Sequence, residues 1–142
     1  MSNKFDIFQY ISLVRFKGIP KLLDKINDKN YNVILDLEDS SKDIFSPKNT
    51  LFLKKQCRLG LDYLNKKKIK HPNIFLRING IKSKFYKEDI LSLNKNLSNN
   101  LKIKGIFVPK IEEYSSLLKI NKSLKLNEKK IKLIPIIESK KG

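Results

Sequence analysis

The sequence predicts an α/β fold in which parallel β-strands alternate with amphipathic α-helices. Five short runs of branched and aromatic residues recur along the 142-residue chain, and longer stretches with apolar residues at helical spacing separate them. Alternation of this kind favours parallel pairing of the strands. No G-x-G-x-x-G motif follows the first run, so a dinucleotide-binding Rossmann fold has no support. Periodicity alone leaves open whether the strands form a doubly wound sheet or part of a barrel.

The predicted strands are short and apolar. They span residues 10–14, 33–37, 74–78, 106–108 and 133–137. Pro135 lies inside the last of these runs. Because proline has no N–H to donate to a neighbouring strand, this run requires either a bulge or a place at the edge of the sheet.

Four predicted helices lie between the strands, and each carries an apolar stripe. The stripes comprise Leu22, Leu23 and Ile26; Leu53, Cys57, Leu61 and Leu64; Tyr86, Ile90, Leu93 and Leu97; and Tyr114, Leu117 and Leu118. The second helix has a well-marked start, with Ser46 as its cap and Pro47 in its first turn. The length of the chain and the lack of a linker-like segment indicate one domain.

The formal net charge of +17 at first suggests a nucleic-acid partner. However, 28 of the 31 basic residues are lysine, and alanine is absent, as expected from an A/T-rich genome. Arginine, which reads bases and clamps phosphates with two hydrogen bonds, occurs only three times. We therefore do not expect nucleic acid to be the partner, and a basic nucleic-acid-binding protein is the third alternative.

Cys57 is the only cysteine, which excludes an intrachain disulfide and a zinc site built from cysteines. Its place on an apolar helical stripe predicts a buried, unreactive thiol. His71 precedes a proline at a strand entry, and we interpret it as structural. The first 20 residues lack the apolar core of a signal peptide, and no run approaches the roughly 20 apolar residues of a membrane span. We expect a cytoplasmic protein without a membrane partner.

Charged and polar residues gather where the predicted strands end. They are Asp36, Glu38 and Asp39; Arg77 and Asn79; Lys110; and Glu138. The carboxyl ends of parallel strands form the active face of α/β folds, so these side chains are candidate site residues. Simpler interpretations remain: Arg77 pairs with Asp36 or Glu38, the acids cap the following segment, and Glu138 is an exposed acid beside Lys140 and Lys141.

Five segments resemble those of one known family, in the same order and in the same secondary-structure context. They are V-I-L-D-L-E-D-S at 33–40, K-K-Q-C-R at 54–58, L-R-I-N-G at 76–80, G-I-F-V-P-K-I-E at 105–112 and L-I-P-I-I-E-S at 133–139. The family is that of the citrate lyase β-subunit, or HpcH/HpaI aldolases, and the resemblance runs from about residue 10 to the end. The first strand departs from the family's L-f-v-P-g, since residues 13–18 read L-V-R-F-K-G.

This resemblance implies a partial (β/α)8 TIM barrel of the phosphoenolpyruvate/pyruvate-binding type. Residues 1–142 would be the N-terminal portion of that domain, with about five parallel strands and four helices, ending before barrel closure. Family members use Mg²⁺ to cleave or form carbon–carbon bonds beside an enolisable acyl group of a hydroxyacyl-CoA or a 2-oxo acid. A cation at the enolate oxygen stabilises the charge that such cleavage leaves.

The resemblance also implies roles for individual residues. The residues expected to act in catalysis are Arg77, Glu38 and Asp39, and those expected to bind substrate are Arg77, Asn79 and Lys110. Glu138 matches the glutamate that binds Mg²⁺, and the second metal ligand of the family, an aspartate, follows the next strand. We expect Glu38 and Asp39 to reach the metal through water. All of these side chains should converge at one end of the sheet.

The main alternative to a lyase is a catalytically inactive truncated paralogue or fragment. Half a barrel leaves two strand edges unpaired, so we expect the 142-residue chain alone to be inactive and prone to association. The full-length form is expected to be a homo-oligomer, a trimer or a hexamer, as is usual in the family.

Overall fold

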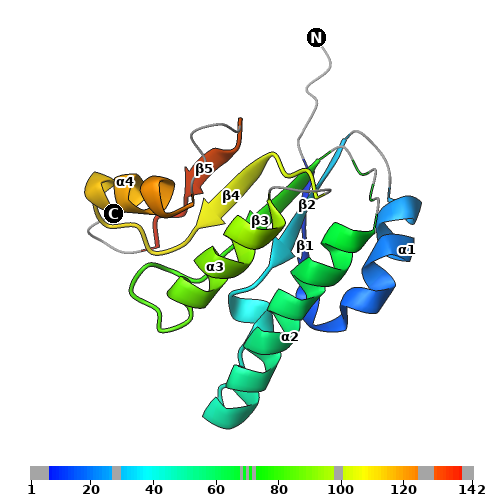
Figure 1. Cartoon of the computed structure of the whole chain (residues 1–142), viewed down its shortest axis with the longest axis horizontal. Helices are drawn as coiled ribbons and strands as arrows, with labels where there is room; N and C mark the ends of the chain where they lie inside the picture. Colours follow the sequence, from blue (N-terminus) through cyan, green and yellow to red (C-terminus); the bar gives the residue numbers. More distant parts are fainter. Residues whose placement is uncertain are drawn as a thin grey trace.

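The computed structural model describes residues 7–26, 30–67, 69, 71, 73–97, 101–124 and 130–138. The strands are β1 (Ile7–Ser12), β2 (Tyr31–Asp36), β3 (Ile74–Arg77), β4 (Gly105–Val108) and β5 (Lys132–Pro135). The helices are α1 (Ile19–Lys25), α2 (Pro47–Lys66), α3 (Tyr86–Asn96) and α4 (Tyr114–Ser123), with 3-10 turns η1 (Leu13–Gly18) and η2 (Asp39–Ser41). The predicted alternation of strands and helices is confirmed, and Figure 1 shows how the elements succeed one another across the molecule.

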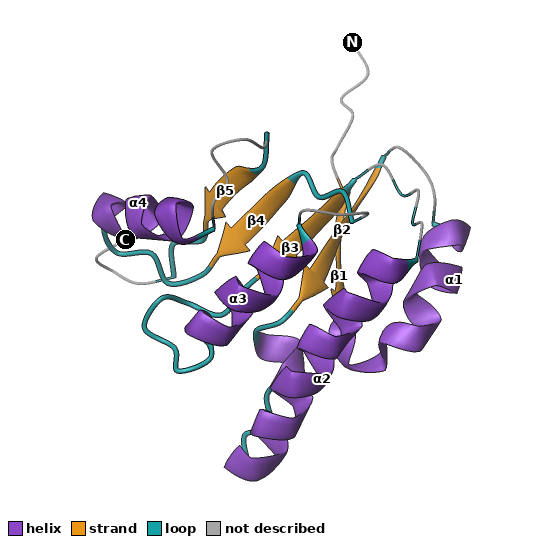
Figure 2. Ribbon diagram, in the orientation of Figure 1, coloured by secondary structure: helices purple, strands orange, loops and turns teal. Residues whose placement is uncertain are grey.

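The strands form one parallel sheet in the order β1-β2-β3-β4-β5. This order follows the chain without a reversal, whereas a doubly wound sheet reverses at its switch point. Figure 2 shows α2 and α3 in front of the sheet, with α1 to the right of α2 and α4 beside β5. A singly wound parallel sheet with helices along one face is the arrangement of an incomplete (β/α) barrel, which confirms the predicted fold class.

The core lies between the helices and the sheet. Its fully buried side chains include Val33, Leu35, Leu61, Leu64, Leu76, Leu93 and Ile106. Burying an aliphatic side chain of this size contributes about 1.5–3 kcal/mol, so this layer holds α2 and α3 on the sheet. Cys57 belongs to the same core, and burial raises the pKa of its thiol to about 11. The prediction of a buried thiol is therefore confirmed.

The other face of the sheet carries aromatic side chains that the described helices do not cover. The rings of Phe8, Phe75 and Phe107 lie with centroids 5.6 to 5.9 Å apart. Phe8 and Tyr10 on β1 remain 46% and 47% exposed. In a closed barrel this face lines the interior, where strands from the far side bury such residues.

Helix α2 starts as predicted, since the Ser46 hydroxyl accepts the N–H of Asn49 at 3.1 Å.

Pro135 is the last residue of β5 and pairs with Val108, and β5 has β4 as its only neighbour among the described strands. The predicted edge position of this proline is therefore confirmed. His71 is buried at the entry to β3, with Nε2 3.1 Å from the carbonyl oxygen of Ile26, as a structural residue would be.

Several assignments of helices and strands were wrong in detail; the fifth strand, for example, ends at Pro135 instead of residue 137. The first strand ends at Ser12 instead of residue 14, because the Ser12 hydroxyl accepts the N–H of Val14 and starts η1. The predicted stripe of α4 is displaced: Tyr114 and Leu118 are 73% and 45% exposed, whereas Ile120 is buried. The packing of α4 on β5, and not the spacing of apolar residues, decides which face is buried.

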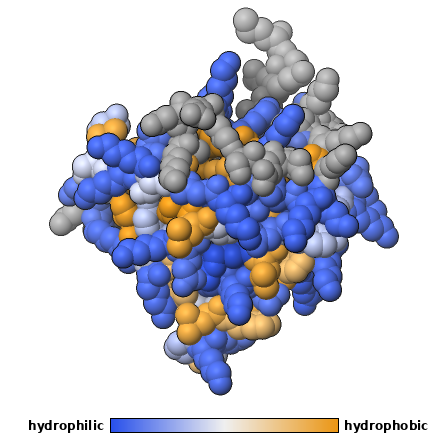
Figure 3. All heavy atoms as spheres, in the orientation of Figure 1, coloured by the Kyte–Doolittle hydropathy of each residue, from blue (hydrophilic) through white to orange (hydrophobic). Residues whose placement is uncertain are grey.

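The surface turned to the viewer in Figure 3 is mainly hydrophilic, with separate hydrophobic patches. This agrees with the high lysine content of the sequence. Among the described helices, none has the length and hydrophobicity that crossing a bilayer requires.

Candidate functional site

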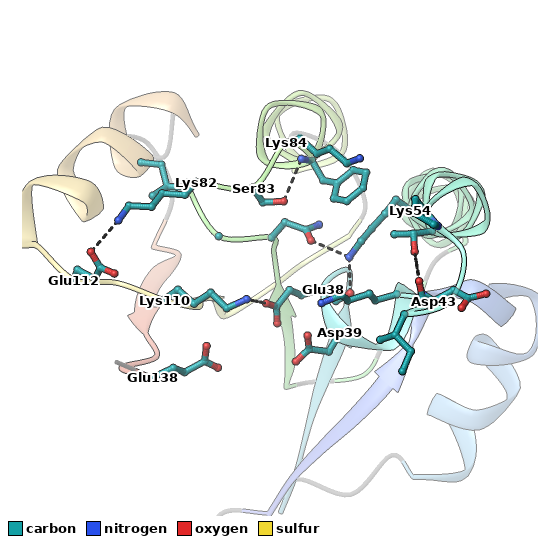
Figure 4. A pocket seen from close by; sticks show the side chains of 18 residues that line it. Glu38, Asp39, Asp43, Lys54, Lys82, Ser83, Lys84, Lys110, Glu112 and Glu138 are labelled. Carbon is teal, nitrogen blue, oxygen red and sulfur yellow. Dashed lines mark hydrogen bonds and ion pairs between the residues drawn. The ribbon is translucent and has the colours of Figure 1, made fainter. Parts of the chain in front are cut away.

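A pocket of about 780 Å³ opens at the carboxyl ends of the strands. The loops that follow β2, β3, β4 and β5 and the first turns of α2 supply its walls. Its polar lining includes Glu38, Asp39, Lys42, Asp43, Lys54, Asn79, Lys82, Lys84, Lys110, Glu112 and Glu138. Figure 4 shows these side chains around a common space, with Glu138 and Lys110 on one side and Lys54 on the other. The apolar lining comes from Ile44, Pro47, Ile81 and Phe85.

Asp36, the last residue of β2, anchors the segment of residues 37–40 that carries Glu38 and Asp39, which we call the acidic loop. Its buried carboxylate accepts the N–H groups of Glu38 and Ser40 at 2.9 and 3.0 Å. Arg77 donates to the same carboxylate through Nε at 2.8 Å and Nη2 at 2.7 Å. Burial alone would raise the pKa of Asp36, but the hydrogen bonds from Arg77 and from the backbone outweigh it and lower the pKa. Asp36 is therefore ionised, and it fixes Arg77 and the loop together.

Arg77 also faces the next two acids of the loop. Its Nη1 lies 3.2 Å from Oε2 of Glu38 and 3.4 Å from Oδ2 of Asp39. The guanidinium stacks over the ring of Tyr10, 4.6 Å from the centroid. The hydrogen bond with Asp36 and the neighbouring carboxylates raise its pKa despite burial. The pairing with Asp36 and Glu38 that the sequence left open is present, and the substrate-binding role of Arg77 stays a prediction.

Glu38 is the most enclosed acid that lines the pocket, with 6% of its surface exposed. Its Oε1 accepts a hydrogen bond from Lys110 at 3.2 Å, while Oε2 faces Arg77 without hydrogen-bond geometry. Burial raises the pKa of Glu38, and the charges of Lys110 and Arg77 offset only part of this rise. A buried carboxyl group with a raised pKa in a pocket is a candidate for proton transfer.

Lys110 directly follows Pro109 after β4 and has a φ of 57°. A left-handed backbone costs a residue with a Cβ about 1–2 kcal/mol, so this conformation needs compensating contacts. The ion pair with Glu38 is one of them, and that hydrogen bond raises the pKa of the Lys110 ammonium. The side chain stays 65% exposed, which leaves its charge open to a ligand in the pocket.

The predicted convergence of the strand-end residues is confirmed. Glu38, Asp39, Asn79, Lys110 and Glu138 all line the pocket, and Arg77 contacts two of them. Figure 4 shows Glu138, after β5, beside the same space as Glu38 and Asp39. Asp39 and Glu138 are exposed, and the alternative partners of Glu138, Lys140 and Lys141, lie outside the described residues. The individual roles assigned to these residues stay predictions.

Asn79 holds a buried position at the end of β3. Its amide donates to the carbonyl of Leu37 at 3.1 Å and to Asp89 at 2.6 Å. Its carbonyl oxygen accepts a hydrogen bond from Lys54 at 2.8 Å. Both donors and the acceptor are thus engaged within the protein, and a substrate contact through this side chain would require one of these bonds to be exchanged.

Lys54 is the site residue that the sequence interpretation missed. It is 3% exposed, which is rare for lysine, and it lies at the inner wall of the pocket. Its sequence signals were a place in the helical segment K-K-Q-C-R and a position three and seven residues before Cys57 and Leu61, which puts it on the buried face of α2. Burial lowers the pKa of the ammonium, and the charges of Asp89 and other acids oppose this effect.

The carboxylates at this pocket are hard oxygen ligands, which suit Mg²⁺ and not a thiolate-seeking metal. Across the described parts of the chain, no group of three or more His, Cys, Asp or Glu side chains is arranged to hold a metal ion. Because Mg²⁺ keeps several waters, one or two carboxylates are sufficient in proteins. The donor set therefore fits Mg²⁺ in kind, and Glu138 is one of its exposed carboxylates.

No protein-family model and no curated protein matches the sequence. Solved structures do match the fold. The citrate lyase β subunit of M. tuberculosis, complexed with oxaloacetate and magnesium, is 18% identical with a TM-score of 0.63, over 96% of this chain and 49% of that one. CitE from M. tuberculosis, in complex with magnesium, acetoacetate and coenzyme A, is 17% identical with a TM-score of 0.62, over 95% and 40%.

RipC from Yersinia pestis is 23% identical with a TM-score of 0.61, over 95% of this chain and 47% of that one. The chain thus has the fold of the citrate lyase β-subunit structures and spans about half of their length. At these identities the likeness establishes the shared fold.

Proposed function

We propose that this chain belongs to the citrate lyase β-subunit (HpcH/HpaI aldolase) family and supplies part of the active site of a Mg²⁺-dependent carbon–carbon lyase. The observation that supports this most is the convergence of Glu38, Asp39, Lys110 and Glu138 on one pocket at the strand ends. The shared fold and the five family-like segments point the same way. The substrate class that follows is a hydroxyacyl-CoA or a 2-oxo or hydroxy acid.

Glu138 would hold the Mg²⁺, with Glu38 and Asp39 contacting it through water. When bound, the metal would supply positive charge for the enolate oxygen that forms as the carbon–carbon bond breaks. Mg²⁺ is also the metal in the related structures with oxaloacetate and with acetoacetate. A second carboxylate ligand would be the aspartate that the family carries after its next strand.

The chain's own side chains would orient the substrate and move a proton. Lys110 presents an exposed ammonium to a substrate carboxylate or thioester oxygen, next to the guanidinium of Arg77. Glu38 lies between these two cations, and the rise of its pKa on burial suits a group that accepts and returns a proton. Asp36 keeps Arg77 in place by accepting two hydrogen bonds from its guanidinium in a bidentate arrangement.

An inactive paralogue is the second candidate, and the lack of a three-ligand cluster within the described residues favours it. The two candidates differ in metal binding. The location in the cytoplasm and assembly of a full-length form as a trimer or hexamer remain expectations of the lyase proposal.

Titration calorimetry with Mg²⁺ in the presence of oxaloacetate tests the proposal on the 142-residue chain. Glu138→Gln removes the charged ligand and should raise the dissociation constant of Mg²⁺ about tenfold or more. Glu113→Gln is the matched control, because Glu113 is an exposed acid outside the pocket lining. Equal Mg²⁺ binding by the two variants, or none by the parent chain, would contradict the assignment of the metal to Glu138.

A further inference from the structure

Lys54 on α2 makes three hydrogen bonds with its ammonium group. Nζ donates to the carbonyl oxygen of Leu37 at 2.7 Å, to Oδ1 of Asn79 at 2.8 Å and to the carbonyl oxygen of Glu38. The ring of Phe85 covers the ammonium at 5.4 Å from its centroid. A protonated lysine has three donors and no acceptor, so all of its hydrogen-bonding capacity is used.

These bonds continue into a buried hydrogen-bond network that joins three elements. Asn79 donates to Asp89 on α3 through both its backbone N–H, at 3.0 Å, and its side-chain amide, at 2.6 Å. Asp89 in turn accepts a hydrogen bond from Arg58 at 3.2 Å. Lys54 and Arg58 are one turn apart on α2, so they lie on the same side of the helix. This hydrogen-bond network therefore connects α2 and α3 to the ends of β2 and β3.

The acidic loop after β2 is held from both sides. Asp36 accepts the N–H groups of Glu38 and Ser40, and Lys54 binds the carbonyls of Leu37 and Glu38. The hydroxyl oxygen of Ser41 lies 2.8 and 3.0 Å from the same two carbonyl oxygens, so its one proton is within reach of both. With φ −96° and ψ −96°, Glu38 is neither helical nor extended, so no regular element fixes its direction. The direction of its side chain depends on these contacts.

We propose that Lys54 is a positioning residue: its ammonium fixes the backbone of the Leu37–Glu38 segment so that the Glu38 carboxylate stands between Lys110 and Arg77 in the pocket. The inference rests on the proposed function, since it assigns Lys54 a part in the same site. It also excludes a different role. A lysine that forms an imine with a 2-oxo acid needs a free, deprotonated amine, and this nitrogen is enclosed by three oxygen acceptors.

The test compares Lys54→Met and Lys54→Arg in the full 142-residue chain with Lys55→Met as control. Lys55 is the exposed neighbour on the same helix. Hydrogen exchange is measured at the amides of Glu38 and Ser40, relative to strand amides of the core, which separates local opening from global unfolding. Lys54→Met should speed exchange at these two amides about tenfold relative to the core, and Lys55→Met should leave it unchanged.

Lys54→Arg keeps the charge, but its planar head group does not reproduce three tetrahedrally arranged donors. It should give an intermediate increase, and it keeps the test decisive where Lys54→Met does not fold. Exchange at Glu38 and Ser40 that tracks the core amides in every folded variant would overturn the inference. So would reductive trapping of oxaloacetate on Lys54 by borohydride, because that outcome makes the lysine a nucleophile.

A second readout separates this inference from the proposed function. The dissociation constant for oxaloacetate with Mg²⁺ should rise about tenfold in Lys54→Met, with partial recovery in Lys54→Arg. If the parent chain binds no oxaloacetate, the proposed function fails, while the exchange data still judge the loop. If Glu138→Gln weakens binding but Lys54→Met does not, the proposed function holds and the role of Lys54 is refuted.

Discussion

The buried ion pair between Asp36 and Arg77 is expected to contribute strongly to the stability of the fold. The Asp36 side chain is 1% exposed and accepts two hydrogen bonds from Arg77 and two from backbone N–H groups. Asp36→Asn replaces one acceptor oxygen by an NH₂ group, which then faces donors, and leaves the guanidinium with the longer contacts to Glu38 and Asp39. Breaking a buried pair in this way costs about 3–5 kcal/mol. That is a large part of the roughly 5–15 kcal/mol that stabilises a typical domain.

Urea unfolding followed by circular dichroism measures this loss, with Asp24→Asn, an exposed acid on α1, as the control. The expected pH dependence follows from the lowered pKa of Asp36. The ionised carboxylate of Asp36 stabilises the fold fully above the pKa of about 3.9 that aspartate has in the unfolded chain. This stabilisation is lost as the pH falls through the lower pKa of Asp36 in the folded protein. Asp36→Asn should therefore remove part of the acid sensitivity. A loss below about 1 kcal/mol, equal to that of the control, would refute this view of the pair.

Three further predictions concern single side chains. Burial raises the pKa of Glu38, which means that the ionised form of this side chain weakens the fold. Glu38→Gln should therefore raise the melting temperature more at pH 8 than at pH 4, and it should weaken oxaloacetate binding. Equal shifts of the melting temperature at both pH values would contradict this. Cys57, with a pKa of about 11 and no exposed surface, should react with a thiol reagent at pH 8 only after unfolding, and rapid labelling of the native chain would contradict its burial. Phe8 lies on the uncovered face of the sheet, so Phe8→Ser should reduce self-association in sedimentation more than Leu91→Ser, which alters an exposed leucine on α3; equal effects would show that this face is not the contact surface.

The elements that carry strong local signals were predictable from the sequence. Ser46 and Pro47 mark the start of α2 because capping is decided within one turn. Pro135 required an edge or a bulge because it lacks a donor, and the structure has it at the end of an edge strand. The clustering of Glu38, Lys110 and Glu138 followed from parallel pairing, since strand ends of one sheet meet at one edge.

What the sequence did not reveal depends on contacts between distant segments. The spacing of apolar residues carries no information about the order of strands in the sheet, and only the resemblance to a known family indicated a barrel. Lys54 has the helical spacing of the core residues Cys57 and Leu61, but a lysine is rarely buried. Its burial is possible because two backbone carbonyls and Asn79 accept hydrogen bonds from its ammonium in the folded chain. The buried face of α4 likewise depends on its docking against β5, which made Ile120 a core residue.

The most direct test of the proposed site is a crystal structure of the chain grown with Mg²⁺ and oxaloacetate. Mg²⁺ should lie about 2.0–2.1 Å from a carboxylate oxygen of Glu138, with water between the metal and Glu38 or Asp39. Oxaloacetate should lie in the same pocket, within hydrogen-bond distance of Lys110 or Arg77. Mg²⁺ bound away from Glu138, or oxaloacetate outside this pocket, would contradict the assignment of the strand-end pocket as the lyase site.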